Sequence, residues 1–142
     1  MVNNDSIDLR IEKMPKENEK SKSINNKNRQ FHKELHDGAI VWIDCDPQAG
    51  HEQSGRRPAL IVSNDVFNQV IPLRFVLPIT HTDRNSPFHV KLNSETKTDG
   101  YIMCEQLRSF DLVARKYEYI EDVPEAILNE VKSILIESIR KE

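Results

Sequence analysis

The side chains best suited to chemistry are concentrated between residues 45 and 58, in the segment CDPQAGHEQSGRRP. His51, Glu52, Arg56 and Arg57 fall within seven positions of one another. Imidazole and carboxylate groups transfer protons, and a guanidinium is a planar donor that matches anionic oxygens. The segment holds two glycines and two prolines, which predicts a long loop, and such loops in compact domains are usually functional or disordered. Composition alone leaves both a functional loop and a solvated charged loop open.

Two further polar groups interrupt apolar segments. Thr80 ends one such segment and is followed by a polar loop with His81 and Arg84. Its simpler interpretation is a β-branched residue that suits the end of a strand. Glu105 and Gln106 interrupt another apolar segment. Glu105 is therefore either a paired carboxylate near the same site or an outward-facing residue.

Several kinds of site are excluded by simple counts. The chain has four glycines, no glycine-rich phosphate loop and no G-x-S-x-G nucleophile motif. Its two cysteines cannot make a disulfide framework or a four-cysteine zinc site. Cys45 lies between Asp44 and Asp46, whose charges are expected to raise the pKa of its thiol, and Cys104 is expected in the core. His, Cys and carboxylate residues do not cluster at metal-ligand spacing, so neither a metal nor another cofactor is expected.

Charge and hydrophobicity are unevenly distributed over the 142 residues. Residues 1–36 carry a net charge of +2 and residues 37–142 a net charge of −5. An acidic domain argues against a general nucleic-acid coater, so any such contact needs a local basic patch. No apolar run approaches the roughly 20 residues that span a bilayer, and the N-terminus has no apolar stretch typical of a signal peptide. A soluble cytoplasmic protein is the expectation.

The chain is predicted to divide at residue 37. Residues 1–36 lack a sustained apolar periodicity and are predicted to be a flexible polar extension, with a partner-binding segment that orders on contact as the alternative. Within it, His32 and His36 have helical spacing, but HKELH is not the HExxH order of zinc enzymes. Residues 37–142 are predicted to form one domain.

The pattern of this domain predicts strands that alternate with short loops and one terminal helix. Pro78 cannot donate to a strand ladder, so it is expected at a sheet edge or bulge. Ser63-Asn64-Asp65 is expected to cap a short helical turn, and Pro124 is expected to start an amphipathic helix. Its core face is predicted to hold Ile127, Leu128, Val131, Ile134, Leu135 and Ile139. The fold class is therefore mainly β (α+β), a small antiparallel barrel with a C-terminal α-helix. The strands are predicted at residues 39–44, 58–63, 73–80, 88–92, 101–107 and 117–120, with a turn or short strand at 108–111.

Residues 42–63 carry the pattern D-x-x-P, then G-x-E-Q-x-G-x-R-P, followed by an apolar strand. L-P-I-T at residues 77–80 with P-F-H-V at 87–90, and E-Q-L-R-S-F-D at 105–111 followed by Arg115, accompany it in order. Together these segments resemble the MazF/PemK family of toxin endoribonucleases, over roughly residues 37–140.

The resemblance implies an SH3-like barrel of the CcdB/PemK type, acting as a homodimer. It implies a toxin of a toxin–antitoxin system that cleaves single-stranded mRNA at specific sequences without a metal and so inhibits translation. By position, Arg57 and Thr80 match the catalytic arginine and threonine, and Glu52 matches the glutamate of the E-Q-x-G segment. A MazE-like antitoxin is the implied partner, docking a largely disordered acidic segment on the region of Arg56, Arg57 and Arg84.

Such cleavage uses the RNA 2′-hydroxyl and leaves a 2′,3′-cyclic phosphate and a 5′-hydroxyl. Glu52 is the natural base because the pKa of arginine is above about 12, with His51 as another option. Trp42, Phe75 and Phe88 are expected to fill the core or a dimer surface rather than stack on bases. The residues expected to contact RNA are His51, Gln53, Arg56, His81, Arg84, Glu105 and Gln106.

Two other functions remain open on the sequence. A CcdB-like toxin that acts on DNA gyrase by protein–protein contact explains the acidic domain and the helix, but not the joint match of Glu52, Arg57 and Thr80. An SH3-like peptide-binding module is less favoured, because its grooves are usually lined by aromatic residues and the 45–58 loop has none.

Overall fold

The computed structural model describes Arg10, residues 34–46 and residues 49–142. Its compact unit runs from Glu34 to Glu142 and so begins three residues before the division expected from composition. Leu35 is buried in this unit, and its carbonyl oxygen accepts a hydrogen bond of 2.9 Å from Arg74 Nε. The expected flexible extension, apart from these few residues, lies outside the described part of the chain.

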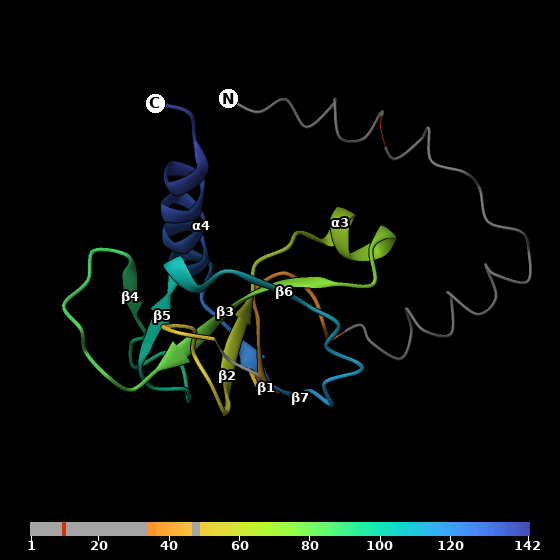
Figure 1. The fold of residues 1–142 in the computed structure, drawn as a ribbon, viewed down its shortest axis with the longest axis horizontal. Helices are drawn as coiled ribbons and strands as arrows, with labels where there is room; N and C mark the ends of the chain where they lie inside the picture. The colour runs from red at the N-terminus through yellow and green to blue at the C-terminus, as the bar shows by residue number, and fades with distance from the viewer. Residues whose placement is uncertain (1–9, 11–33, 47–48) are drawn as a thin grey trace, which may run out of the picture. The chain divides into compact units, whose positions relative to one another are not determined.

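Seven strands form one antiparallel sheet (Figure 1). Their order is β4-β5-β3-β2-β1-β7, and β6 pairs with one end of β3. The strands are β1 (Ala39–Asp44), β2 (Arg56–Ile61), β3 (Arg74–Thr80), β4 (His89–Lys91), β5 (Tyr101–Met103), β6 (Arg108–Phe110) and β7 (Glu118–Asp122).

The prediction of a mainly β fold, a small antiparallel sheet structure with a C-terminal helix, is confirmed, and its sheet is open rather than strictly closed into a barrel. Closure requires the first and last strands of the order to pair. In the described residues, β4 and β7 stand at opposite ends of the order and do not pair with each other. The sheet is therefore open, and its end strand β4 is only three residues long.

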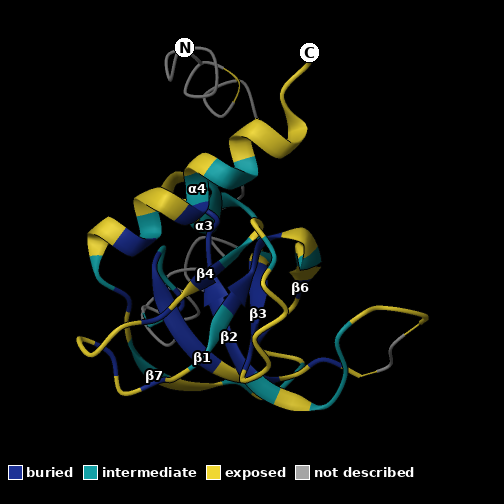
Figure 2. Cartoon of the chain, turned by 90° about the vertical axis from the view of Figure 1, so that its left-hand side faces the viewer, coloured by how far each residue is buried: buried dark blue, intermediate teal, exposed yellow. Residues whose placement is uncertain are grey.

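Both faces of the central strands are buried, as the continuous apolar run at residues 58–63 predicts (Figure 2). Ile40 and Leu60 contribute to a core cluster beneath α4, the helix Glu125–Ile139. Val41 and Ile61 contribute to a second cluster with Phe110 and Leu112. Alternate residues of β1 and β2 thus serve two cores, which fixes the strand register because a slip of one residue would exchange the faces.

The terminal helix follows its predicted apolar pattern except at its end. Ile127 and Val131 are buried, and Leu128 packs against the same cluster with Ile134 and Leu135. Ile139, predicted on the core face, is 79% exposed, because the last turn extends past the sheet (Figure 2). No helix in the described residues is both long and apolar enough to span a membrane.

The short helix α3 (Asp65–Val70) forms where a capping residue was predicted. Asn64 is its N-cap, and the side-chain oxygen accepts a hydrogen bond of 2.9 Å from Phe67 N. This contact satisfies one of the backbone donors that a helix start leaves unpaired.

Most strand boundaries differ from the prediction by a few residues, and two of these differences affect the candidate site. β2 begins at Arg56 rather than at Pro58, because β1 extends to Asp44 and the two residues pair. The predicted strand at residues 101–107 ends after Met103, and η1, a 3-10 turn at Cys104–Gln106, carries the polar residues. The arginines therefore lie on a strand and the Glu105–Gln106 pair on a turn.

The expectation that Pro78 marks a sheet edge or a bulge is also wrong. Pro78 is buried in the middle of the sheet, in register with Ala59 of β2. On its other side, β3 pairs with β6 up to Val76 and with β5 from Ile79 onward. Pro78 thus lies where the neighbouring strand changes, which is a place where a missing backbone donor costs little.

Candidate active site

Arg57 and Thr80 lie beside each other on the adjacent strands β2 and β3. The register of these strands pairs Ala59 with Pro78, and its continuation by two residues places Arg57 opposite Thr80. Arg57 Nη1 also lies 3.4 Å from the carbonyl oxygen of Ile79, the residue before Thr80. Directly opposed residues of an antiparallel pair point to the same face. The two residues that the sequence singles out as catalytic are therefore brought together.

Neutral oxygen atoms hold the Arg57 guanidinium. Arg57 Nε donates a hydrogen bond of 2.9 Å to the carbonyl oxygen of Ser54. In the orientation that satisfies both groups, the Gln53 side-chain oxygen accepts from Arg57 Nη1 at 2.9 Å and from Nη2 at 2.6 Å. The ion pairs of the described residues do not include Arg57. Its positive charge is thus fixed in direction and, in this part of the chain, is not neutralised by a carboxylate.

The Thr80 hydroxyl is buried and oriented by the backbone. Thr80 is 5% exposed, and its Oγ1 accepts a hydrogen bond of 3.2 Å from Thr82 N. The oxygen is an acceptor in this contact, so the hydroxyl hydrogen is left to donate to a ligand. Gly100, which sequence reasoning did not single out, closes the other side: its φ is +123°, and an added Cβ would clash with the carbonyl oxygen of Thr80.

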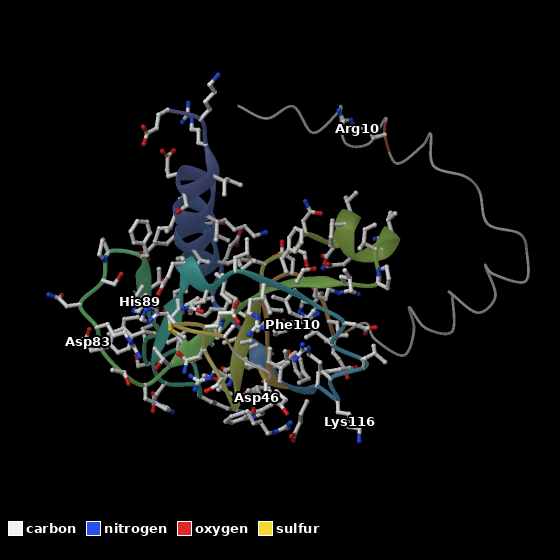
Figure 3. All side chains as sticks on the ribbon, viewed as in Figure 1. Arg10, Asp46, Asp83, His89, Phe110 and Lys116 are labelled. Atoms are coloured by element: carbon white, nitrogen blue, oxygen red, sulfur yellow. The ribbon has the colours of Figure 1, made fainter. Side chains whose placement is uncertain are left out.

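Two arginines from the end of the sheet hold the root of the loop that precedes β2. Arg115 Nη1 donates to the carbonyl oxygens of Asp44 and Asp46, at 2.9 Å and 2.8 Å. Arg108 Nη1 donates to the carbonyl oxygen of Cys45 at 3.1 Å. Both guanidinium groups lie over the ring of Phe110, which Figure 3 labels, at 4.5 Å for Arg108 and 3.8 Å for Arg115. The positioning role of these arginines was missed, although Arg115 belonged to the pattern that carried the resemblance.

Glu52 is exposed on the same loop and makes a local turn. Its Oε2 accepts a hydrogen bond of 3.0 Å from Ala49 N, and Glu52 N donates to the carbonyl oxygen of Ala49 at 3.1 Å. These contacts hold the carboxylate within the loop rather than at Arg57 or Thr80. His51 is also exposed, and its carbonyl oxygen accepts from Gln106 Nε2 at 3.1 Å.

Three of the other predicted RNA contacts are exposed: Arg56 on strand β2, and His81 and Arg84 on the loop after β3. Arg56 points to the face opposite Arg57, where its Nη2 lies 3.3 Å from Glu118 Oε2, so the two neighbouring arginines are not brought together. Phe88, Trp42 and Phe75 are 47%, 37% and 37% exposed, so these three aromatic residues do not fill the core.

Glu105 proves to be a paired carboxylate. Its Oε1 lies 2.7 Å from Nε2 of His89, whose side chain is 3% exposed (His89 is labelled in Figure 3). Gln106 is the next residue of η1, and its amide contacts the 45–55 loop at two places. The turn η1 thus joins the loop to strand β4 through adjacent side chains.

The thiols are not nucleophiles of this site. Burial raises the pKa of Cys45 and outweighs the opposing effect of Arg57, Arg108 and Arg115. The raised pKa agrees with the prediction, but burial is the main cause and the charge of Asp44 contributes least. Three guanidinium groups, those of Arg57, Arg108 and Arg115, therefore lie near the buried Cys45 thiol. The described residues contain no group of three or more His, Cys, Asp or Glu side chains arranged to hold a metal ion.

An open antiparallel sheet with one terminal helix, carrying a fixed arginine beside a threonine hydroxyl, defines a small β protein whose candidate site offers donors suited to an anion. Residues 36–139 match the family model described as PemK-like, MazF-like toxin of type II toxin-antitoxin system. The chain therefore belongs to this toxin family, and the resemblance read from its motifs is confirmed.

Relatives and solved structures agree with this assignment. Endoribonuclease PemK from Escherichia coli is 43% identical over 98 residues, covering 66% of this chain and 74% of the relative. Endoribonuclease toxin ChpB from E. coli K12 is 39% identical over 105 residues, covering 67% and 90%. The structure of MazF from Deinococcus radiodurans has a TM-score of 0.70 at 35% identity, covering 75% of this chain and 96% of that one. A MazE-MazF structure from the same organism has a TM-score of 0.65 at 34% identity, with the same two coverages. A gyrase-directed toxin is not favoured, since the relatives are named endoribonucleases.

Proposed function

We propose that this chain cleaves single-stranded mRNA at specific sequences without a metal, and that Arg57, Thr80 and Glu52 carry the reaction. The chain is the endoribonuclease toxin of a type II toxin–antitoxin system, and cleavage of mRNA in the cytoplasm would inhibit translation. The observation that carries the proposal is the Arg57–Thr80 pair, in which a fixed guanidinium, without a carboxylate partner among the described residues, stands beside a buried hydroxyl donor.

The reaction needs no group from outside the RNA and the protein. The 2′-hydroxyl oxygen forms a bond to the adjacent phosphorus while the bond from phosphorus to the 5′-oxygen breaks. A base takes the 2′-hydroxyl proton and an acid supplies one to the 5′-oxygen, which leaves a 2′,3′-cyclic phosphate and a 5′-hydroxyl. Arg57 and the Thr80 hydroxyl donate to the non-bridging phosphate oxygens, where negative charge increases in the transition state.

Glu52 is the proposed base, because an arginine is not deprotonated in proteins. Its carboxylate is exposed and holds only the Ala49 amide within the described residues, so RNA can displace this contact. His51 is the alternative, as the side chain that ordinarily titrates nearest to neutral pH. Glu52→Gln and His51→Gln distinguish the two, because the variant that removes the base loses the acidic limb of the pH–rate profile.

The test is cleavage of a defined RNA with sequencing of the new 5′-hydroxyl ends. Arg57→Ala and Thr80→Val are each expected to lower kcat by about 10²–10³-fold, the usual cost of removing one transition-state donor. The circular dichroism spectrum and the Tm are expected to stay close to those of the parent. Full activity in a folded Arg57→Ala protein would refute the assignment. Activity that disappears in EDTA and returns with a divalent cation would refute the metal-free mechanism.

An acidic antitoxin segment is the proposed partner of the same surface. MazE-MazF complexes are among the solved structures that resemble this chain. The positive region around Arg57, Arg108 and Arg115 would receive carboxylates as well as RNA phosphates. Antitoxin and RNA are therefore expected to compete. Simultaneous saturation by both ligands in a fluorescence-anisotropy titration would contradict this.

A homodimer is proposed from the apolar surface that the domain leaves exposed. Ile136 and Ile139 of α4 are 56% and 79% exposed, and neither belongs to the core clusters of the part of the chain that the structure describes. Light scattering after size exclusion is expected to give twice the mass of the chain. A monomer mass at micromolar concentration would contradict the proposal.

A further inference from the structure

The amide of Gln106 bridges two backbone groups of the 45–55 loop. Gln106 Oε1 accepts a hydrogen bond of 3.2 Å from Gln53 N, and its Nε2 donates one of 3.1 Å to the carbonyl oxygen of His51. A side-chain amide is thus placed where a neighbouring strand would pair with the loop. Both the donor and the acceptor of the amide are engaged, and this requirement fixes its orientation.

Gln53, which Gln106 contacts through its backbone N, also contacts Arg57 through its side chain. The side-chain oxygen of Gln53 accepts from both terminal nitrogens of the Arg57 guanidinium. The next carbonyl along the chain, that of Ser54, accepts from Arg57 Nε. Because these two residues contact all three guanidinium nitrogens, the position of residues 53 and 54 helps to set where the Arg57 charge points, together with the Ile79 carbonyl oxygen.

Gln106 itself stands on an anchored turn. The adjacent Glu105 is paired with the buried His89 of β4, at 2.7 Å. Two residues further on, Arg108 of β6 approaches the Gln53 carbonyl oxygen at 3.5 Å. In the described part of the chain, the hydrogen bonds that join the backbone of residues 51–53 to η1 and β6 come from Gln106 and Arg108. The tip of the loop is otherwise exposed.

We propose that Gln106 is a positioning residue, which sets the direction of the Arg57 guanidinium by holding the backbone of His51 and Gln53. The proposal rests on the proposed function of Arg57 and adds a residue that acts through another rather than on the RNA. Misplacement of a catalytic group by about 1 Å costs as much as 10²-fold in rate. The expected signature of a positioning role is therefore a loss in kcat with little change in KM.

The experiment measures cleavage of a short fluorescent RNA by Gln106→Ala, by the isosteric Gln106→Glu and by the control Asn129→Ala on the exposed face of α4. Both Gln106 variants are expected to lose about 10–100-fold in kcat and to keep KM within about threefold, and the control to match the parent. Gln106→Glu keeps the shape of the side chain but replaces the donor to the His51 carbonyl oxygen with a carboxylate oxygen, so the contact that holds His51 is lost. Unchanged kcat in a folded Gln106→Glu protein overturns the proposal. A raised KM with unchanged kcat also overturns it and indicates a direct RNA contact.

A double-mutant cycle and an RNA-free measurement separate this proposal from the proposed function. In an Arg57→Ala background, adding Gln106→Ala is expected to lower kcat by less than a further threefold. A loss as large as the one that Gln106→Ala causes in the parent overturns the proposal. Amide hydrogen exchange at Gln53 is expected to be at least about tenfold faster in Gln106→Ala than in the parent, and equal exchange overturns it. If Arg57→Ala keeps full activity, the proposed catalytic role of Arg57 fails. Faster amide exchange at Gln53 in Gln106→Ala would then show only that Gln106 holds the loop, with no catalytic arginine to position.

Discussion

Arg57 donates from Nη1 to the carbonyl oxygen of Ile79, so the guanidinium of one strand is tied to the peptide that carries the Thr80 side chain on the next. The contact is made across the register of β2 and β3, within the buried part of the sheet. Rigid strands hold catalytic geometry better than loops do. The strand register therefore fixes the distance between the two strands, while the direction of the Arg57 guanidinium also depends on its contacts with Gln53 and Ser54.

Gly100 is expected to be essential for this geometry, although it carries no chemical group. Gly100→Ala forces a Cβ into the Thr80 carbonyl oxygen at a φ of +123°, which should lower the free energy of unfolding by about 2–4 kcal/mol and reduce cleavage. The control is Gly50→Ala, also at a positive φ (+55°) but with nothing near the added Cβ, which should cost about 1 kcal/mol. Urea denaturation of both variants measures the difference, and equal losses would contradict a close-approach role for Gly100.

Arg115 is expected to be irreplaceable by lysine. Its guanidinium donates to two carbonyl oxygens and lies over the Phe110 ring, and an ammonium group cannot do both. Arg115→Lys should therefore loosen the loop root, lowering kcat by about tenfold and the free energy of unfolding by about 1–2 kcal/mol. Arg140→Lys, at an exposed pair with Glu137 beyond α4, is the matched control and should change neither quantity. Parent-like kinetics in Arg115→Lys would show that the charge alone suffices.

The sequence predicted the elements well where one physical signal dominates. The apolar run at residues 58–63 required burial on both faces, and the spacing of Ile127, Leu128 and Val131 required a helix. The prediction from sequence failed where the pairing of strands determines the structure of a segment. Arg56 and Arg57 have a loop-like composition, but pairing with β1 makes them part of a strand. Pro78 is tolerated inside the sheet only because two different strands meet beside it, and one chain's composition does not show that.

The candidate site was predicted as a set of residues, but not as a set of contacts. Arg57 and Thr80 were named together from the motif, and their adjacency follows from a register that no local pattern determines. The predicted contact residue Gln106 holds the loop, and Arg56 faces away toward Glu118. These roles depend on which face of a strand or turn a side chain occupies, which changes with a shift of one residue.

Glu121 is expected to make stability depend on pH below about pH 5. Burial opposes its ionisation, but hydrogen bonds from Lys97 N, Thr98 N and Thr98 Oγ1 outweigh that effect and lower the pKa of Glu121. A carboxylate with a lowered folded-state pKa stabilises the fold above its unfolded-state pKa, and the stabilisation disappears as the pH falls through the folded-state pKa. Glu121→Gln should therefore cost about 1 kcal/mol at pH 7 and progressively less below pH 5. A difference in urea midpoints that stays constant from pH 7 to pH 4 would contradict this.

Both cysteine thiols are expected to be unreactive in the folded protein. Burial raises the pKa of Cys45, and burial with the nearby charges of Glu105 and Glu130 raises the pKa of Cys104 to about 12. The thiolate is the reactive form, so the fraction available near pH 8 falls by about 10³-fold for Cys104, and the side chain is also screened from reagent. Treatment with a chromogenic disulfide reagent at pH 8 should label neither thiol until guanidinium unfolds the chain, when both should react. Rapid labelling of Cys45 before unfolding would mean that the loop root held by Arg108 and Arg115 opens in the native state. A root that already opens in the parent would make the Arg115 contacts unimportant for activity, so the kcat of Arg115→Lys should then resemble that of the parent.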